Sequence, residues 1–249
     1  MDSSRIAGSV ALITGGARGT GATIARRLAG LGTTVVIADV DTVMGRATAA
    51  AIDGHFVECD VRGWAENSAA VSETLRKYGK LDLVALNARA DAAFRPGEAF
   101  DVAGYRRSMS VNLDGVVYGA LAALPALRGS GGGEIIATTS VADLLPATSD
   151  AVYGASQAAV VGFVRALGRR WAEHRVRINA LCVGIAEAEY LDTAYDTVHE
   201  AEVADAFLSV LTGAGTGESW SVLPGAALMP FTFGESPVEQ EPSTEGGRR

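Results

Sequence analysis

Short runs of apolar residues alternate with longer amphipathic stretches along most of this chain. The runs are rich in Val, Ile and Leu with few charges among them, which is typical of strands that are buried on both faces. The predicted strands are Val10–Thr14, Thr34–Ala38, His55–Cys59, Leu81–Leu86, Glu134–Thr139, Arg177–Val183 and Ser219–Leu223.

Between these runs, apolar residues recur at helical spacing, as Ile24, Ala25 and Leu28 illustrate. Strands that alternate with helices form βαβ units, and right-handed crossovers place the helices on both faces of one parallel sheet. The pattern therefore predicts an α/β fold with a doubly wound parallel sheet of seven strands. The predicted helices are Gly21–Leu31, Val43–Ile52, Trp64–Tyr78, Asp101–Leu127 and Ala151–His174.

We predict a single domain over residues 1–233, because no linker interrupts this alternation. The stretch 234–249 is polar and rich in Glu, Pro and Gly, so we predict a mobile tail there. The segment Ile185–Val203 is acidic and is expected to form a loop over the site. It either disfavours anionic substrates or is an ordinary solvated loop.

Composition excludes several classes of function. The chain has 249 residues, 48% of them hydrophobic, which is enough for a sizeable core. Its net charge of −8 would repel nucleic acid and anionic lipid, so neither is expected as a partner. The longest apolar run, Gly115–Leu127, contains Pro125 and is too short to span a bilayer. With no signal-like start, we expect a soluble cytoplasmic protein.

Cysteine and histidine offer no metal site. The two cysteines, Cys59 and Cys182, cannot build a disulfide scaffold and are expected to be small buried hydrophobes. The three histidines, His55, His174 and His199, show no metal-ligand spacing. We therefore expect no metal.

A glycine-rich loop follows the first predicted strand and opens the first predicted helix. It reads Thr14-Gly-Gly-Ala-Arg-Gly-Thr-Gly21. Glycine permits a sharp turn close to a phosphate, and the helix N-terminus offers free N–H groups. Placed after a strand and near the start of the chain, the loop indicates a dinucleotide site. Its candidate cofactor-binding residues are Gly15, Arg18, Gly19, Thr20 and Gly21.

Asp39 ends the second predicted strand, about twenty residues further on. An acid at that place can accept hydrogen bonds from the adenosine ribose and would repel a 2′-phosphate. Arg18 argues the other way, because a cation in the loop could hold such a phosphate. Since repulsion at close range should outweigh a mobile arginine, we predict NAD as the cofactor, with NADP less favoured.

Taken together, these motifs resemble the short-chain dehydrogenase/reductase family over about residues 8–225. Besides the TGxxxGxG loop, Ser140 and Tyr153 stand where the family carries Ser and the tyrosine of YxxxK, and Asn112 matches its helix asparagine. The resemblance implies a Rossmann fold, a nicotinamide cofactor, and hydride transfer between a secondary alcohol and a ketone. It also implies a dimer or tetramer, formed with itself or with a related chain, that pairs Asp101–Leu127 and Ala151–His174.

By the same resemblance, Tyr153 exchanges the proton at the substrate oxygen, Ser140 hydrogen-bonds that oxygen, and Asn112 extends the proton relay. Asp60 and Val61 would hold the adenine ring. Further candidates from the resemblance are Asn87, beside the adenosine ribose, and Gly184, after the sixth strand.

The chain departs from the family at the position of the YxxxK lysine, which is Gln157. In the family that ammonium binds the nicotinamide ribose and lowers the tyrosine pKa, by about 1–3 units for a cation within a few ångström. Gln157 can still bind ribose hydroxyls but carries no charge. The chain's two lysines, Lys77 and Lys80, flank a distant turn. We therefore expect weak activity, activity at high pH, or none.

Two further departures fall in the nicotinamide half. Arg89 replaces a glycine of the family's NNAG motif, and it either crowds the cofactor or binds an anionic group. Ala188 replaces a threonine that contacts the carboxamide in the family. Two functions stay open: an NAD-dependent oxidoreductase with an impaired proton relay, or a non-catalytic subunit that pairs with itself or an active relative. A redox-sensing dinucleotide binder ranks below both.

Overall fold

In the computed structural model, the structure describes residues 6–90, 99–141, 151–184 and 198–231. Its centre is one sheet of strand order β3-β2-β1-β4-β5-β6-β7-β8. The first seven strands are parallel to their neighbours and the last is antiparallel. The strands are β1 (Val10–Thr14), β2 (Thr34–Asp39), β3 (His55–Glu58), β4 (Leu83–Leu86), β5 (Gly133–Ser140), β6 (Val176–Val183), β7 (Ser219–Val222) and β8 (Met229–Phe231).

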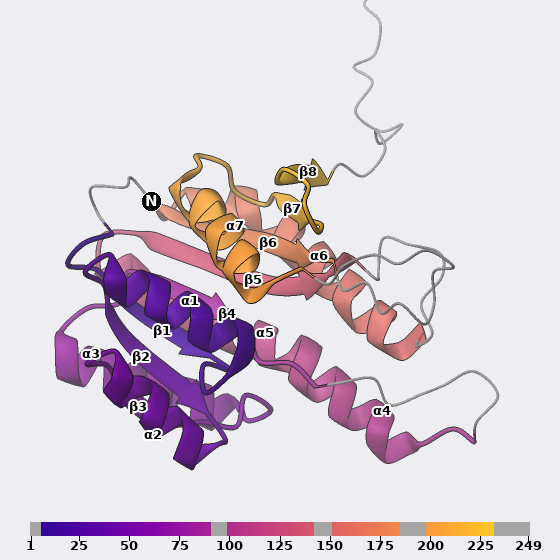
Figure 1. Ribbon diagram of the computed structural model, residues 1–249, viewed down its shortest axis with the longest axis horizontal. Helices are drawn as coiled ribbons and strands as arrows, with labels where there is room; N and C mark the ends of the chain where they lie inside the picture. Colours follow the sequence, from indigo (N-terminus) through magenta and orange to yellow (C-terminus); the bar gives the residue numbers. More distant parts are fainter. Residues whose placement is uncertain (1–5, 91–98, 142–150, 185–197, 232–249) are drawn as a thin grey trace, which may run out of the picture.

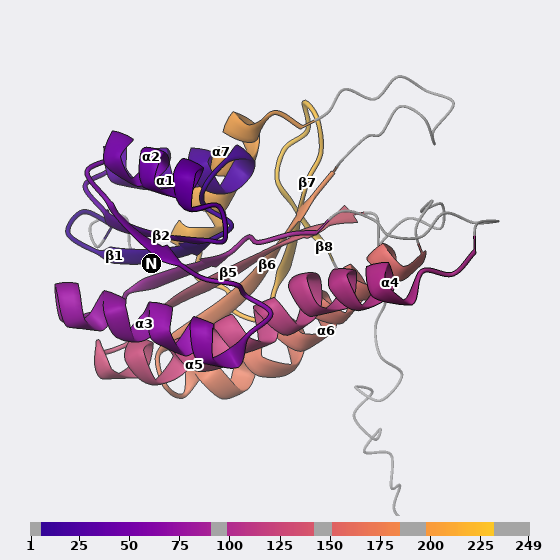
Figure 2. The same ribbon diagram turned by 90° about the horizontal axis from the view of Figure 1, so that it is seen from below.

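Helices cover both faces of this sheet, as Figure 2 shows. On one side lie α1, α2 and α7, and on the other α3, α5 and α6, with α4 extending beyond the sheet (Figures 1 and 2). The helices are α1 (Gly19–Gly30), α2 (Thr42–Ala51), α3 (Trp64–Tyr78), α4 (Val102–Met109), η2 (Ser110–Asp114), α5 (Gly115–Gly129), α6 (Ala151–Ala172) and α7 (Glu200–Thr212).

The core is divided by the sheet into two apolar layers. Successive residues of a strand point to opposite faces, so Ile135 and Ala137 pack under α5 and α6, whereas Ile136 packs under α1 and α7. This alternation fixes which face each residue of β5 presents. The predicted doubly wound α/β fold is confirmed.

Three features were not predicted. The expected helix Asp101–Leu127 contains a π-helical turn, Ser110–Asp114. Helix α7 occupies a stretch where we predicted only a loop up to Val203, so its first turn corrects that prediction. The eighth strand, β8, pairs antiparallel with β7 at the edge of the sheet and adds to the seven predicted strands. The predicted tail 234–249 lies outside the described residues.

Helices α4, η2 and α5 run on without a break over Val102–Gly129, and this helix is long and apolar enough to cross a membrane by length and composition alone. Val116, Ala120, Ala123 and Leu127 are nevertheless buried in the core layer beneath the sheet. A helix with such a face is the ordinary core helix of an α/β fold.

The sheet order also locates the site. β1 lies between β2 and β4, so the chain winds one way from β1 to β3 and the other way from β4 onwards. Open α/β sheets bind ligands at the carboxyl ends of their strands, in the crevice where this reversal occurs.

Candidate active site

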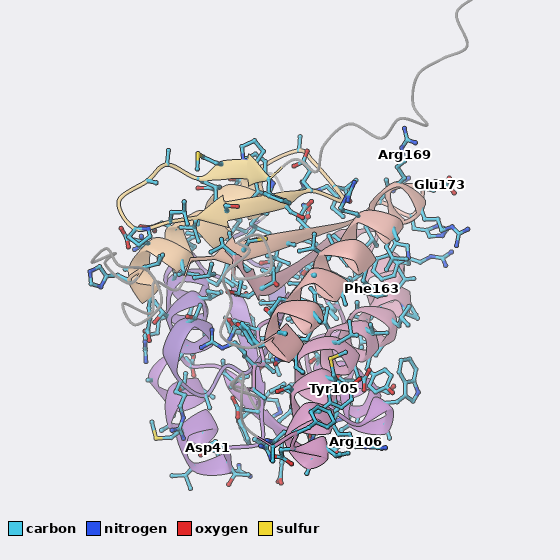
Figure 3. The ribbon with its side chains drawn as sticks, turned by 90° about the vertical axis from the view of Figure 1, so that its right-hand side faces the viewer. Asp41, Tyr105, Arg106, Phe163, Arg169 and Glu173 are labelled. Atoms are coloured by element: carbon cyan, nitrogen blue, oxygen red, sulfur yellow. The ribbon has the colours of Figure 1, made fainter. Side chains whose placement is uncertain are left out.

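A cavity of about 720 Å³ opens at this crevice. Its walls come from the carboxyl ends of β1 to β6 and from the segments that follow them. Asp41 belongs to the layer of α1 and α2, and Tyr105 and Arg106 lie on α4 at the other side of the same edge (Figure 3). Of the predicted site residues, nine line the cavity: Gly15, Arg18, Gly19, Thr20, Asp39, Asp60, Val61, Asn87 and Gln157.

The glycine loop has the geometry that a close phosphate requires. Gly15 and Gly19 have φ angles of +64° and +58°, a region that favours glycine. A Cβ on Gly15 would lie 2.6 Å from the Cα of Ala88, and one on Gly21 would lie 2.2 Å from the carbonyl oxygen of Gly15. The loop therefore packs too tightly for side chains at these positions. Gly21 packs against the loop but does not itself line the cavity.

Helix α1 presents its N-terminus to this loop. Its N-cap residue, Arg18, makes no side-chain cap hydrogen bond, and its first turn holds no acidic residue. The N–H groups of a first turn and the helix dipole favour an anion. The residues present thus fit the pyrophosphate of a dinucleotide.

Asp39 is held rigidly at the end of β2. One carboxylate oxygen, Oδ2, accepts a hydrogen bond from the backbone N–H of Ala17 at 3.0 Å, and Oδ1 accepts one from the N–H of Asp41 at 2.9 Å. Arg18 forms an ion pair with Asp41. The cation that could have held a 2′-phosphate is therefore already paired with a carboxylate.

The wall beyond β3 is formed by Asp60, Val61 and Arg62. A hydrogen bond from Arg62 holds the pKa of Asp60 below its usual range, so this carboxylate stays charged. Val61 is buried, and a Cβ on Gly115 would meet it at 2.8 Å. Val61 and Val111 line the cavity and offer apolar surface to a flat ring.

Asn87 and Asn112 position the segment after β4. The Asn87 side chain donates to the carbonyl oxygen of Gly15 at 3.2 Å, which ties this segment to the glycine loop. Asn112, in the π-helical turn, accepts from the N–H of Ala90 at 2.8 Å and donates to its carbonyl oxygen at 3.1 Å. Arg89 lies between these two anchors and lines the cavity with an exposed side chain.

Gln157 is 3% exposed, and its carboxamide is held by neighbouring side chains. Thr139 Oγ1 donates to Gln157 Oε1 at 2.9 Å, and Gln157 Nε2 donates to Ser156 Oγ at 3.3 Å. Asn112 Nδ2 also donates to Ser156 Oγ, at 3.3 Å. A network of neutral groups therefore occupies the position at which the family carries an ammonium.

Three further predicted residues, Ser140, Tyr153 and Gly184, do not line the cavity. Ser140 is the last residue of β5 and is buried, and Tyr153 lies in the first turn of α6, one helical turn before Gln157, with its hydroxyl buried. Gly184 follows β6, and its N–H donates to the carbonyl oxygen of Val222 at 2.8 Å. Ala188 lies outside the described residues.

The chain's two lysines are engaged elsewhere. Lys77 Nζ contacts His55 Nδ1 at 3.0 Å on the surface of α3. Lys80 pairs with Asp82 at 2.9 Å just before β4, at the amino ends of the strands and so away from the cavity. Within the described ranges, no group of His, Cys, Asp and Glu could hold a metal ion. Cys59 and Cys182 are both buried.

Sequence reasoning missed several residues of the site. Ser156 and Thr139 hold Gln157, and Thr138, Arg62 and Arg107 line the cavity. The alternation of side chains along β5 could have predicted that Thr138 and Thr139 point to opposite faces of the sheet. No sequence signal would have brought Arg62 and Arg107 to the same cavity.

These observations define the class as an α/β protein with a cavity at the switch point of its sheet whose residues fit a dinucleotide. Comparison with known proteins agrees. Residues 9–198 match the family model for short chain dehydrogenases. A short-chain dehydrogenase reductase of Arabidopsis thaliana is 35% identical over 225 residues, covering 86% of this chain and 83% of the relative. The chain belongs to the short-chain dehydrogenase/reductase family, as its motifs indicated.

Two further relatives carry more specific descriptions. A 2-dehydro-3-deoxy-L-rhamnonate dehydrogenase (NAD(+)) of Sphingomonas sp. is 34% identical over 189 residues, which is 76% of each chain. The crystal structure of 3-ketoacyl-(acyl-carrier-protein) reductase from Brucella melitensis, complexed with NADH, aligns with a TM-score of 0.83 at 26% identity. The alignment covers 88% of this chain and 98% of the reductase.

Proposed function

We propose that this chain is an NAD-dependent oxidoreductase that interconverts a secondary alcohol and a ketone, with a proton relay weakened by Gln157. The observation that carries this proposal is the neutral network of Gln157, Thr139 and Ser156. Thr139 and Gln157 line the same cavity as the glycine loop, and Gln157 stands one helical turn from Tyr153. The residues expected to bind adenosine, among them Asp39, Asp60 and Asn87, all line the cavity. The half of the site that would transfer the proton lacks the lysine ammonium of the family.

NAD is favoured over NADP by the charges at the end of β2. Two backbone N–H groups hold the Asp39 carboxylate at the cavity wall, and Arg18 is engaged by Asp41. A 2′-phosphate would meet a fixed negative charge there. The rhamnonate dehydrogenase and the Brucella reductase, whose descriptions mention NAD(+) and NADH, support the same preference.

The proton moves through this chain's own residues. A bound nicotinamide supplies the hydride acceptor in alcohol oxidation and the hydride donor in ketone reduction. Tyr153 takes the hydroxyl proton during oxidation and returns it to the ketone oxygen during reduction, while Ser140 hydrogen-bonds that oxygen. Because Gln157 adds no positive charge, the Tyr153 phenolate is less stabilised than beside an ammonium, so oxidation requires a higher pH.

The alternative function is that of a non-catalytic subunit, favoured by the same observation. The Gln157 carboxamide is held by protein groups on both its oxygen and its nitrogen, and the only lysines in the sequence are bound elsewhere. Such a subunit would bind NAD and pair through its long helices with a second copy or a related chain. In both cases we propose a cytoplasmic protein.

The experiment combines binding with turnover. NAD⁺, NADH and NADP⁺ are titrated into the purified protein, and a panel of secondary alcohols, ketones and acyl thioesters is assayed with the cofactor that binds. We expect NAD⁺ to bind more tightly than NADP⁺. We expect the turnover rate to fall well below the usual range of about 1–10³ s⁻¹. Binding without any turnover would favour the non-catalytic subunit, and no dinucleotide binding would overturn the proposal.

A further inference from the structure

The Thr138 hydroxyl is a buried polar group that the fold leaves unsatisfied. Its Oγ1 has no hydrogen-bond partner in the described part of the chain, although its neighbour Thr139 donates to Gln157. Buried polar atoms in folded proteins are nearly always paired, so an unpaired one calls for a specific reason. Ser219 Oγ, at the start of β7, is buried and unpaired as well.

The two hydroxyls differ in their surroundings. Thr138 lines the cavity together with Gln157 and Val183, whereas Ser219 does not. Thr138 stands two residues before Ser140 in β5, so both residues point to the face that Ile136 presents to α1 and α7. Only the Thr138 side chain can therefore meet a ligand.

The geometry of the sheet shows which part of a dinucleotide would reach Thr138. β2 and β5 are three strand spacings apart, about 14 Å at 4.7–4.9 Å each. With the adenosine ribose at Asp39 and the pyrophosphate at the N-terminus of α1, the other end of the ligand lies over β5 and β6. This step depends on the function proposed above.

The side chains packed nearest to Thr138 in the cavity wall suit a neutral polar group, although Arg89 and Arg107 line other parts of the same cavity. Thr139, Gln157 and Val183 line it beside Thr138, and none of them is charged. The nicotinamide ring bears one hydrogen-bonding substituent, a neutral carboxamide. A hydroxyl can donate to its oxygen or accept from its nitrogen.

We infer that Thr138 is a cofactor-binding residue whose hydroxyl hydrogen-bonds the nicotinamide carboxamide. Thr138 lines the cavity while its Oγ1 is buried. A rotation of about 120° about the Cα–Cβ bond, to the next staggered rotamer, is the movement by which the hydroxyl would turn towards a bound carboxamide. The ligand then satisfies a group that the ligand-free protein leaves unpaired, so binding is favoured without any charge.

The test compares Thr138→Val, which replaces the hydroxyl by a methyl group, with Thr138→Ser, which retains it. Calorimetry measures the Kd of NAD⁺ and of ADP-ribose, which lacks nicotinamide. We expect Thr138→Val to weaken NAD⁺ binding about fivefold, the effect of one neutral hydrogen bond, and to leave ADP-ribose binding unchanged. Thr138→Ser should bind both ligands like the parent protein.

Stability supplies a second readout that an ordinary structural threonine would not give. Because Thr138→Val removes an unpaired buried hydroxyl, it should raise the Tm of the ligand-free protein by about 2–4 °C for each kcal/mol gained. Ser219→Ala is the matched control. It should also raise the Tm but leave both Kd values unchanged.

Each outcome has a definite meaning. Equal NAD⁺ affinity in Thr138→Val and the parent, equal losses for NAD⁺ and ADP-ribose, or a lowered Tm in Thr138→Val would each overturn the inference while dinucleotide binding stands. A parent protein that binds neither ligand would overturn the proposed function and this inference with it.

Discussion

At the scale of single residues, the proposed function depends most on Asp39 and Gln157. The Asp39 carboxylate is fixed by two backbone donors, so its charge cannot swing away from an approaching phosphate. The Gln157 side chain is fixed as firmly but is neutral. In the function that we propose, Asp39 sets which dinucleotide binds, and Gln157 sets how readily a proton moves afterwards.

Replacing Asp39 should change cofactor preference. We expect Asp39→Asn to strengthen NADP⁺ binding about 5- to 10-fold, because it removes the charge that faces the 2′-phosphate. NAD⁺ binding should weaken with the loss of a ribose acceptor. Calorimetric Kd values for both dinucleotides provide the measurement, and Asp53→Asn, outside the cavity, serves as the control. An unchanged NAD⁺ to NADP⁺ ratio would contradict the role of Asp39.

Cys59 lines the cavity yet should be chemically inert. Burial raises its pKa to about 12, aided by the nearby carboxylates of Glu66, Asp60 and Asp39. At pH 8 only about one thiol in 10⁴ is then ionised, and the thiolate is the reactive form. We expect iodoacetamide to label Cys59 in unfolded protein but not in native protein, as read by mass spectrometry. Rapid labelling of native Cys59 would contradict this expectation.

At the scale of elements, β5 and β6 form the longest pairing of the sheet and carry a buried ion pair near their amino ends. Arg177 Nε donates to Glu134 Oε1 at 2.6 Å, and its other nitrogens donate to the carbonyl oxygens of Gly215 and Leu211. Burial raises the pKa of Glu134, with Arg177 opposing that shift. This pair ties the sheet to the end of α7, away from the cavity.

Breaking the pair should destabilise the fold in a pH-dependent manner. Arg177→Met removes the guanidinium that pairs with the buried Glu134 carboxylate, which should lower the free energy of unfolding by about 3–5 kcal/mol at pH 8. The folded pKa of Glu134 lies above the unfolded value, so protonation at lower pH favours the folded state. Urea unfolding should therefore show a smaller deficit at pH 5 than at pH 8.

The double variant Glu134→Gln/Arg177→Met is the control for this prediction. With the carboxylate removed, most of the lost stability should return and the pH dependence should disappear. A deficit in Arg177→Met that is the same at pH 5 and pH 8 would show that Glu134 is not its cause.

The elements that sequence predicted best are those with strong local signals. β1 is an almost continuous apolar run, β6 is mostly apolar over its second half, and the glycine loop marks the start of α1. β8 has three residues, two of them exposed, so no periodicity marks it. Helix α7 comes directly after an acidic stretch, so the apolar face that includes Phe207 and Val210 was not recognised as part of a helix.

The site residues that sequence predicted are likewise those with local motifs, whereas contacts between distant parts of the chain were missed. Spacing from the glycine loop predicted Asp39, the family resemblance predicted Asp60 and Asn87, and all three line the cavity. The hydrogen bond between Thr139 and Gln157 joins β5 to α6 across eighteen positions of the sequence, and such a contact depends on packing. Asn112 was expected in a regular helix, whereas a π-helical turn aims it at Ala90.

At the scale of the whole molecule, helices α4 to α6 expose apolar side chains among charged ones (Figure 3). Tyr105 on α4 and Phe163 on α6 lie on the same side of the molecule in Figure 3. On the helix that joins α4 to α5, Leu121 is 40% exposed and Tyr105 39%. Helices α4 to α6 are those through which we propose that the chain pairs.

A charge on this side should separate the copies. We expect Leu121→Asp to reduce the molecular mass in solution from that of an oligomer to that of one chain, because a buried aspartate in an apolar interface has no partner. Light scattering after size-exclusion chromatography measures the mass. Val43→Asp, on the opposite layer and 75% exposed, should leave it unchanged. A parent protein that is monomeric would contradict the pairing.

The most direct measurement for the whole account is the pH dependence of NAD⁺-linked alcohol oxidation in the parent protein and in Gln157→Lys. We predict that parent turnover rises steeply towards alkaline pH, and that the lysine variant moves the profile down by about 1–3 pH units and gains at least about tenfold at pH 7. Ordinary parent turnover at pH 7, with an identical profile in Gln157→Lys, would contradict the claim that the missing ammonium limits proton transfer.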